Sequence, residues 1–317
     1  MANTPSFVTI GEAMTMFVAN TPGELSQVTS FSRSLAGAEV NVAIGMARLG
    51  FHSTYVTKVG NDSFGDFIKQ SVQYEKIQTN YILESTTNAT GFMLKSNVTD
   101  GSDPKVEYYR RNSAASTLNV DDIDSKLFLQ QPHLHLTGVS VAVSASLRHA
   151  AKQALKLAKE QGCRVSFDTN LRPALWPDQA TMIKEINDFA FASDIILPGI
   201  EEGKILAGSD QPEEIANFYL RHGSQAVVVK LGSKGAYFKT QSGESGTVMG
   251  FPVAKVIDTV GAGDSFAVGV ISALLEGKDM AHAARRGNLL GSLTVQVRGD
   301  SEGLPTRNVL SELEKAE

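Results

Sequence analysis

The part of the sequence best suited to chemistry is an aspartate inside a glycine-rich turn. Asp264 follows Gly261, Ala262 and Gly263, and apolar residues at helical spacing come after it. Successive backbone N–H groups at a helix N-terminus, unshielded by side chains, form a binding site for phosphate. A carboxylate beside that site can accept a hydroxyl proton during phosphoryl transfer. The turn therefore predicts a kinase in which Asp264 is the catalytic base.

Other interpretations of this turn are weaker. A P-loop requires a lysine after the glycines, and a dinucleotide fingerprint requires a glycine where this sequence has Phe266. An isolated aspartate in the first turn of a helix is usually a cap. We favour the catalytic interpretation because the turn is expected to follow a strand that ends near Ile257. Open α/β sheets bind their ligands at the carboxyl ends of such strands.

The rest of the chain predicts the elements that would position this turn. From residue 133 onward, short apolar runs alternate with amphipathic stretches, which is the pattern of βαβ units. The expected strands are 133–138, 164–168, 194–198, 225–231, 235–239 and 246–256, and the expected helices include 38–49, 146–161 and 179–192. Gly50, Gly162, Gly208 and Gly223 stand where left-handed helix C-caps are expected. We therefore predict a Rossmann-like, doubly wound α/β fold with a mostly parallel sheet.

One region departs from the βαβ pattern. Residues 91–98 and 105–111 are both strand-like, and the turn cluster 99–104 separates them without a helix. They predict a hairpin that would join the first strands of the chain in a small antiparallel sheet projecting from the main body. We expect segments 14–36 and 86–116 to form a lid over a pocket in this way.

Composition narrows the class of protein. The chain has 317 residues, a net charge of -5 and one cysteine, Cys163, which argues against nucleic-acid binding, an internal disulfide and a cysteine-based zinc site. The first basic residue is Arg33 and no apolar run approaches a membrane span. We therefore expect one cytoplasmic domain over residues 1–317, with no signal peptide and no membrane contact. His133 and His135 are expected to pack rather than to bind metal.

Two separated motifs resemble those of the PfkB (ribokinase-like) family of carbohydrate kinases. The turn DTVGAGDSF is similar to the carboxyl-terminal signature of that family, and AGAEVNVAIGMARLG with KVGNDSFGDF is similar to its amino-terminal signature. The resemblance spans nearly the whole chain and implies a Rossmann-like core with a β-sheet lid over a sugar. It also implies that Asp264 is the base and that Gly261, Ala262 and Gly263 supply the anion hole.

Two further stretches bear on the identity of the sugar. Residues 106–116 and 166–176 resemble those of family members that phosphorylate 2-keto-3-deoxygluconate at its terminal primary hydroxyl, and the second stretch also occurs in fructokinase-like relatives. That substrate carries a carboxylate, which arginine can hold with paired hydrogen bonds. Strand alternation predicts that only one of Arg110 and Arg111 faces the ligand. The candidate substrate-binding residues are Gly37, Asn41, Tyr109, Arg110 and Arg172.

The resemblance also implies where ATP and metal ions bind. The candidate nucleotide-binding residues are Lys230, Gly232, Ser233, Gly235 and Asn288. Glu202 matches the acidic residue that helps to organise Mg²⁺ through water, although Gly199 replaces the usual asparagine. A potassium (K⁺) site near the anion hole is implied as well, with Asp258 and the loop 297–303 as its ligands. We expect a homo-oligomer that forms through the lid.

Two rival functions stay open on the sequence. A fructokinase- or ribokinase-like enzyme would act on a neutral sugar, and Arg110 and Arg172 would then matter little to substrate affinity. A non-catalytic sugar or nucleotide binder would keep its function after Asp264→Asn. Many relatives carry an aspartate near the end of the first strand, where this chain has Glu12, so a plain ribose is not the expected substrate.

Overall fold

The computed structural model describes residues 5–98, 104–130 and 132–315, and a large sheet runs through its centre. The nine strands lie in the order β13-β12-β11-β10-β9-β8-β1-β4-β5. Seven of them are parallel: β1 (Ser6–Ile10), β4 (His52–Gly60), β5 (Ile82–Ser85), β8 (His133–Thr137), β9 (Val165–Asp168), β10 (Ile195–Ile196) and β11 (Ala226–Lys230). The antiparallel β12 (Ala236–Thr240) and β13 (Ser245–Val248) complete one edge. The predicted doubly wound, mostly parallel fold is confirmed.

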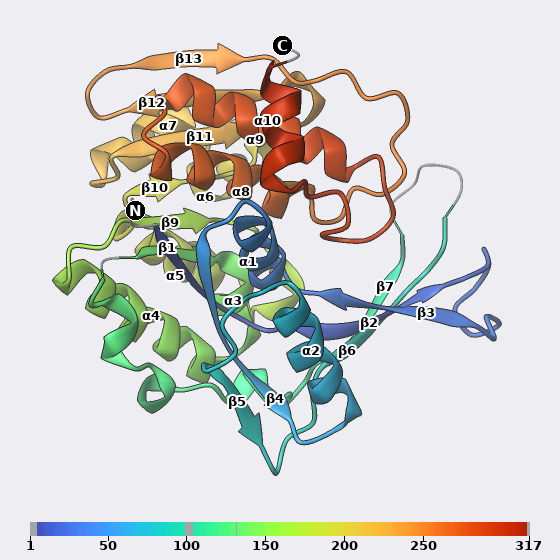
Figure 1. Cartoon of the computed structure of the whole chain (residues 1–317). Helices are drawn as coiled ribbons and strands as arrows, with labels where there is room; N and C mark the ends of the chain where they lie inside the picture. The colour runs from blue at the N-terminus through green and yellow to red at the C-terminus, as the bar shows by residue number, and fades with distance from the viewer. Residues whose placement is uncertain (1–4, 99–103, 131, 316–317) are drawn as a thin grey trace.

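Helices cover both faces of this sheet, because successive strand residues point to opposite sides. In β1, Phe7 packs into the core beneath α1 (Ala38–Arg48) and α8 (Ala262–Leu275), whereas Val8 packs into the core beneath α4 (Ala145–Glu160) and α5 (Gln179–Phe191). The first face carries α1 (Ala38–Arg48), α2 (Ser63–Tyr74), α8 (Ala262–Leu275), α9 (Met280–Thr294) and α10 (Arg307–Lys315). The second face carries α3 (Gly138–Val143), α4 (Ala145–Glu160), α5 (Gln179–Phe191), α6 (Ile200–Leu206) and α7 (Pro212–Arg221) (Figure 1).

A second sheet of four strands, here called the small sheet, projects from one side of the main body (Figure 1). Its order is β3-β2-β6-β7, with β2 (Met14–Ala19), β3 (Phe31–Ala36), β6 (Phe92–Lys95) and β7 (Val106–Tyr109). The predicted hairpin is confirmed as the antiparallel pair β6 and β7. The prediction of a wholly antiparallel sheet is wrong, because α1, β4 and α2 intervene before β6 and the chain returns parallel to β2. Residues 99–103 of the predicted turn lie outside the described residues.

The predicted strand over residues 246–256 is wrong beyond Val248, where β13 ends. Pro252 lacks the N–H group that a ladder needs, and β13 is already the edge of the sheet. The apolar side chains that follow, such as Phe251, line a cavity instead of pairing with another strand. An irregular segment, and not a strand ending near Ile257, therefore leads to α8.

Local predictions from glycine and histidine are confirmed. Left-handed backbone angles occur at the four glycines predicted to end helices: Gly50, Gly162, Gly208 and Gly223. His133 and His135 pack inside the sheet, where one ring nitrogen of each lies 2.8 Å from the Ser166 hydroxyl. Burial lowers the pKa of both histidines to about 3, so both are neutral. Among the helices of the described residues, none is both long and apolar enough to cross a membrane.

Candidate active site

Two cavities meet where the central parallel strands end. One, of about 450 Å³, lies between the main sheet and the small sheet, and we call it the small-sheet cavity. The other, of about 710 Å³, lies beside α8 and α9, and we call it the α8–α9 cavity. Lys230, Thr259 and Gly263 line both cavities. A ligand in one cavity can therefore touch a ligand in the other at this junction.

Asp264 lies on the small-sheet cavity in the first turn of α8, and only 8% of it is exposed. One carboxylate oxygen accepts a hydrogen bond of 2.8 Å from Asn41 Nδ2, and the other lies 3.5 Å from Asn170 Nδ2. Burial raises the pKa of Asp264 to about 8; the bond from Asn41 opposes this rise, and the negative charges of Asp168 and Glu39 add to it. A carboxylate with a pKa near the working pH is suited to accepting a proton.

The start of α8 depends on glycine. Gly261 is the N-cap with φ of 80°, and a Cβ atom there would lie 2.0 Å from the carbonyl oxygen of Asp300. Glycine alone meets both the left-handed backbone and the close approach. A Cβ atom on Gly263 would meet nothing closer than Lys230 Nζ at 3.7 Å, so this face is open to the junction. The first N–H groups of a helix have no partner within it, and those of α8 begin with Ala262.

Gly37 and Asn41 lie at the start of α1 on the wall of the small-sheet cavity. Gly37 has φ of 142°, and a Cβ atom there would approach the carbonyl oxygen of Glu12 to 2.5 Å. The glycine thus lets α1 begin directly against the loop after β1. Among the described residues, the buried Oδ1 of Asn41 has no hydrogen-bond partner. Because such an atom is costly when left unpaired, it is suited to accept a hydrogen bond from a ligand hydroxyl.

The end of β7 contributes one aromatic and one basic side chain to the small-sheet cavity, Tyr108 and Arg110. Arg110 contacts the buried carboxylate of Glu12 through Nε at 2.7 Å and Nη2 at 2.6 Å. Tyr109 points the other way and stacks on Phe92, with ring centroids 4.6 Å apart. Tyr109, which we predict to cover the substrate, is therefore not among the residues that line this cavity, because alternation along β7 places Tyr108 on the face of Arg110.

The loop after β9 brings two more polar side chains to the same cavity, Asn170 and Arg172. Asn170 adopts a left-handed backbone with φ of 30°, a conformation that asparagine tolerates better than most residues. Arg172 is exposed, and its Nη1 donates a 2.9 Å hydrogen bond to the carbonyl of Leu171. Arg110 and Arg172 therefore line the same cavity, Arg110 from the small sheet and Arg172 from the main sheet.

An ion pair that the sequence does not predict, between Lys230 and Asp168, lies where the two cavities meet. Lys230 Nζ donates a 2.7 Å hydrogen bond to Asp168, the last residue of β9, which is 1% exposed. Burial raises the pKa of Asp168, and Lys230 opposes that rise. Burial also disfavours the charge on Lys230, but Asp168 and Glu202 outweigh it and raise the pKa of this lysine. The signal available in the sequence was a carboxylate at the end of the predicted strand 164–168.

Glu202 lies in the first turn of α6 and holds the loop after β9. Its carboxylate accepts hydrogen bonds from the N–H groups of Gly199 and Leu171, both at 2.7 Å, and from the Thr169 hydroxyl at 2.6 Å. Burial disfavours its ionisation, but Lys230 and these hydrogen bonds lower its pKa below the ordinary value. Within the described residues, no group of three or more His, Cys, Asp or Glu side chains is arranged to hold a metal ion.

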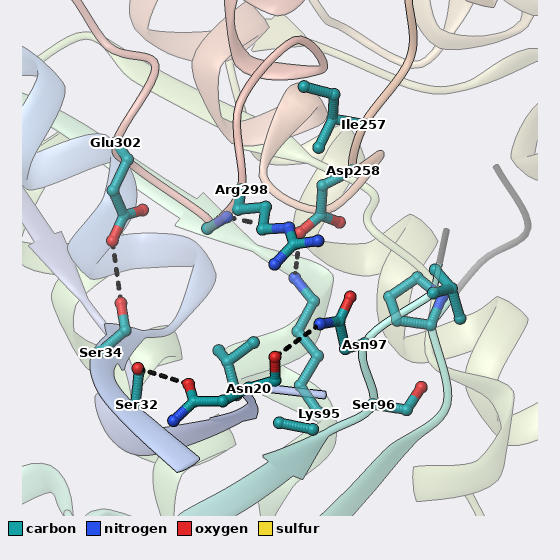
Figure 2. A pocket seen from close by; sticks show the side chains of 15 residues that line it. Asn20, Ser32, Ser34, Lys95, Ser96, Asn97, Ile257, Asp258, Arg298 and Glu302 are labelled. Atoms are coloured by element: carbon teal, nitrogen blue, oxygen red, sulfur yellow. Dashed lines mark hydrogen bonds and ion pairs between the residues drawn. The ribbon is translucent and has the colours of Figure 1, made fainter. Parts of the chain in front are cut away.

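Asp258 lies beside a third cavity, of about 200 Å³, between the small sheet, the segment before α8 and the loop after α9 (Figure 2). Its Oδ2 is 2.6 Å from the Nζ of Lys95, the last residue of β6. The residue predicted to bind potassium is thus paired with a lysine of the small sheet, a contact that no pattern in the sequence predicts.

The predicted nucleotide-binding residues all line the α8–α9 cavity: Lys230, Gly232, Ser233, Gly235 and Asn288. Asn288 Nδ2 donates hydrogen bonds of 3.1 Å to the carbonyl oxygens of Val248 and Met249, which ties α9 to the end of β13. Phe251 and Val256, from the segment after β13, give this cavity an apolar wall. A flat, partly apolar ligand with an anionic end at the junction fits these surroundings.

These features are those of an α/β phosphotransferase. The site combines a buried carboxylate at a helix start that glycine shapes, an ionised lysine close to it, and two adjoining cavities at one edge of a doubly wound sheet. Comparison with known proteins gives the family more closely, because residues 4–307 match the pfkB family of carbohydrate kinases. The chain belongs to this family. It is 49% identical to the 2-dehydro-3-deoxygluconokinase of Bacillus subtilis (strain 168), over 96% of this chain and 94% of the relative. It is 34% identical to the 2-dehydro-3-deoxygluconokinase of Thermoproteus tenax, over 98% and 94%.

Solved structures share the same fold. A PfkB protein from Polaromonas sp. JS666 superposes with a TM-score of 0.90 at 46% identity, covering 97% of this chain and 99% of that one. A putative ribokinase II from E. coli, in complex with ATP and Mg²⁺, gives 0.90 at 26% identity, covering 99% and 100%. A fructokinase double mutant from Vibrio cholerae O395, bound to fructose, ADP and a potassium ion, gives 0.86 at 27% identity, covering 98% and 99%.

Proposed function

We propose that this carbohydrate kinase transfers the γ-phosphate of ATP to the terminal primary hydroxyl of 2-keto-3-deoxygluconate, giving the 6-phosphate and ADP. The observation that carries the proposal is the position of Asp264, which lines the small-sheet cavity and directly follows Gly263, a residue that lines both cavities. The 2-dehydro-3-deoxygluconokinase activity of the relative at 49% identity supports the choice of sugar.

In the proposed reaction Asp264 takes the proton of the substrate hydroxyl while that oxygen forms a bond to the γ-phosphorus. The bond between this phosphorus and the bridging oxygen breaks, and its electron pair leaves with ADP. Asn41 and Asn170 hold the carboxylate toward the cavity. The N–H groups at Gly261, Ala262 and Gly263 stabilise charge on the transferring group, and the proton on Asp264 later passes to solvent.

ATP is proposed to occupy the α8–α9 cavity with its phosphates directed at Lys230. The turn that carries Gly232, Ser233 and Gly235 would lie along the nucleotide, and Asn288 would stand near the base. A bound Mg²⁺ would neutralise negative charge on the phosphates. The ionised Glu202 and the buried Asp168 are the acidic groups at the junction that suit this ion. We propose that Glu202 contacts it through water, because both of its oxygens already accept hydrogen bonds.

The sugar is proposed to lie in the small-sheet cavity, with its carboxylate between Arg110 and Arg172. Asn41 Oδ1 would accept a hydrogen bond from a sugar hydroxyl, and the backbone at Gly37 would lie against the sugar. Tyr108, rather than the predicted Tyr109, would cover the sugar. The small sheet would then act as the predicted lid.

A second candidate, a kinase for a neutral sugar, is favoured by one observation. The charge of Arg110 is already balanced by Glu12, which reduces its value for a substrate carboxylate. On this alternative Arg172 would also contribute little to substrate affinity. The two candidates are therefore separated by whether Arg172→Ala weakens binding of an acidic sugar alone.

Identification of the product tests the proposed reaction. The purified protein, ATP, Mg²⁺ and 2-keto-3-deoxygluconate should yield a sugar phosphate whose phosphorus-31 signal couples to the two protons of the terminal carbon. A phosphate on any other carbon, or release of inorganic phosphate without a sugar phosphate, would contradict the proposed role of the cavity.

The predicted cytoplasmic location and self-association remain proposals. Tyr109 is 49% exposed on the face of the small sheet that is turned away from the cavity, so this face is our choice for contact with a second copy. Light scattering on the purified chain should report a dimer that Tyr109→Glu weakens. A monomer at all concentrations would remove this proposal and leave the reaction untouched.

A further inference from the structure

A deeply buried ionic cluster at the edge of the small-sheet cavity, which Lys95 and Asp300 help to line, joins the small sheet to the main body. Lys95 is 2% exposed, and its Nζ lies 2.6 Å from Asp258 Oδ2 and 3.2 Å from Asp300 Oδ1. Both carboxylate side chains are less than 9% exposed. Figure 2 shows Lys95 reaching from the small sheet toward Asp258. A charge this deeply buried needs its partners, so the three residues act as a unit.

The two carboxylates belong to the loops that shape the start of α8. Asp258 accepts hydrogen bonds from the N–H groups of Val260 at 3.1 Å and Gly299 at 3.4 Å. The carbonyl of Asp300 packs so closely on Gly261 that no Cβ atom fits between them. The ammonium group of Lys95 therefore holds together the two loops that set the backbone of the anion hole.

A potassium ion does not fit this arrangement. The predicted ligands of K⁺ were Asp258 and the loop 297–303, which contains Asp300, and these are the groups that contact Lys95. A second monovalent cation bound directly to Asp258 would lie beside the ammonium group of Lys95, and burial of these side chains weakens the screening of that repulsion. This differs from the Vibrio cholerae fructokinase structure, which holds a potassium ion.

We propose that Lys95 is a tethered monovalent cation: its ammonium group takes the place of K⁺ between Asp258 and Asp300 and keeps the anion hole in its active shape. Lys95 is a positioning residue for the proposed phosphoryl transfer, on which this inference rests. Because Lys95 belongs to β6, the same contact couples the position of the small sheet to the phosphate-binding turn. The enzyme should therefore work without added potassium.

The first test compares wild-type turnover with tetramethylammonium, Na⁺ or K⁺ as the only monovalent cation. Rates that agree within about twofold support the proposal, and a requirement for K⁺ overturns it. In Lys95→Met the kcat should fall on the order of 100-fold with KM for both substrates little changed, as for loss of an anion-hole donor. Saturable recovery of kcat by K⁺ in this variant supports the proposal. Wild-type kcat in Lys95→Met, or a rise confined to the KM of the sugar, overturns it.

Melting temperatures give a readout that needs no substrate. K⁺ in place of tetramethylammonium should raise the melting temperature of Lys95→Met and leave that of the wild type unchanged. Lys58→Met is the matched control, because Lys58 makes an equally short ion pair of 2.6 Å with Asp122 away from the anion hole, and it should show no response to K⁺. Absence of a K⁺ effect specific to Lys95→Met overturns the proposal. A wrong choice of sugar would leave the melting results intact, so the two failures are distinguishable.

Discussion

Asp264→Asn should lower turnover by orders of magnitude and, at alkaline pH, make the protein more stable. In the wild type, burial raises the pKa of Asp264 to about 8, whereas the unfolded chain ionises this group near 3.8. When folding raises the pKa of a carboxyl group, the folded state is destabilised at a pH where that group must ionise. The stability of the wild type should therefore fall as the pH rises from about 4 to about 8, and asparagine removes this loss.

The size of the effect follows from these two pKa values. At about 1.4 kcal/mol for each pH unit between them, the ionised Asp264 lowers the free energy of unfolding above pH 8 by on the order of 5 kcal/mol. In a chain of this length that corresponds to roughly 5–10 °C in melting temperature. Asparagine keeps an oxygen that can accept the 2.8 Å hydrogen bond from Asn41.

The assay is the melting temperature of ligand-free protein across this pH range, with turnover measured on the same samples. Asp264→Asn should gain stability at alkaline pH, the gain should shrink toward pH 5, and kcat should drop about 10²–10⁴-fold. Asp210→Asn is the control, because Asp210 is exposed and should show neither effect. A gain of equal size at both ends of the pH range, or a variant less stable throughout, would refute the reasoning about burial.

Three further predictions concern the same site. The kcat/KM of the wild type should rise with pH and level off above about 8, because Asp264 must lose its proton before it can accept one; a profile flat from about pH 6 to 9 would remove it from this role. Arg172→Ala should raise KM for the acidic sugar about 10-fold and spare fructose, whereas Arg111→Ala, exposed and outside the cavity lining, should change neither. Gly261→Ala should lower kcat at least about 100-fold, because the new Cβ atom would lie 2.0 Å from the carbonyl oxygen of Asp300. Gly277→Ala is the control: Gly277 has φ of 75° and open space around it, so this variant introduces backbone strain without a clash. Equal losses in the two glycine variants would show that strain, and not the shape of the turn, causes the effect.

The sequence predicted the parts of the site that depend on local chemistry. The glycine-rich turn located Asp264 and the start of α8 because helix N-termini and left-handed glycines leave short-range signals. The segment before this turn was assigned to a strand because its residues are apolar. That assignment failed since these side chains line the α8–α9 cavity, a use of apolar residues that composition cannot distinguish from pairing in a sheet.

The rest of the site depends on contacts between distant segments. Lys95 and Asp300 are 205 residues apart in the chain, and neither has a neighbour in the sequence that indicates its partner. The choice between Tyr108 and Tyr109 required the register of β7 against β6, because polar and aromatic residues occur on both faces of the small sheet. Asp168 could have been found, because it is the carboxylate that ends a predicted strand at the ligand-binding edge.

The most direct test of the central claim is ADP release by the purified protein with ATP and Mg²⁺. The assay compares 2-keto-3-deoxygluconate, fructose, ribose and no sugar at equal concentrations. The account predicts that turnover with the keto-deoxy acid exceeds turnover with either neutral sugar by at least about tenfold. Turnover that favours fructose or ribose would contradict the assignment of the small-sheet cavity to an acidic sugar.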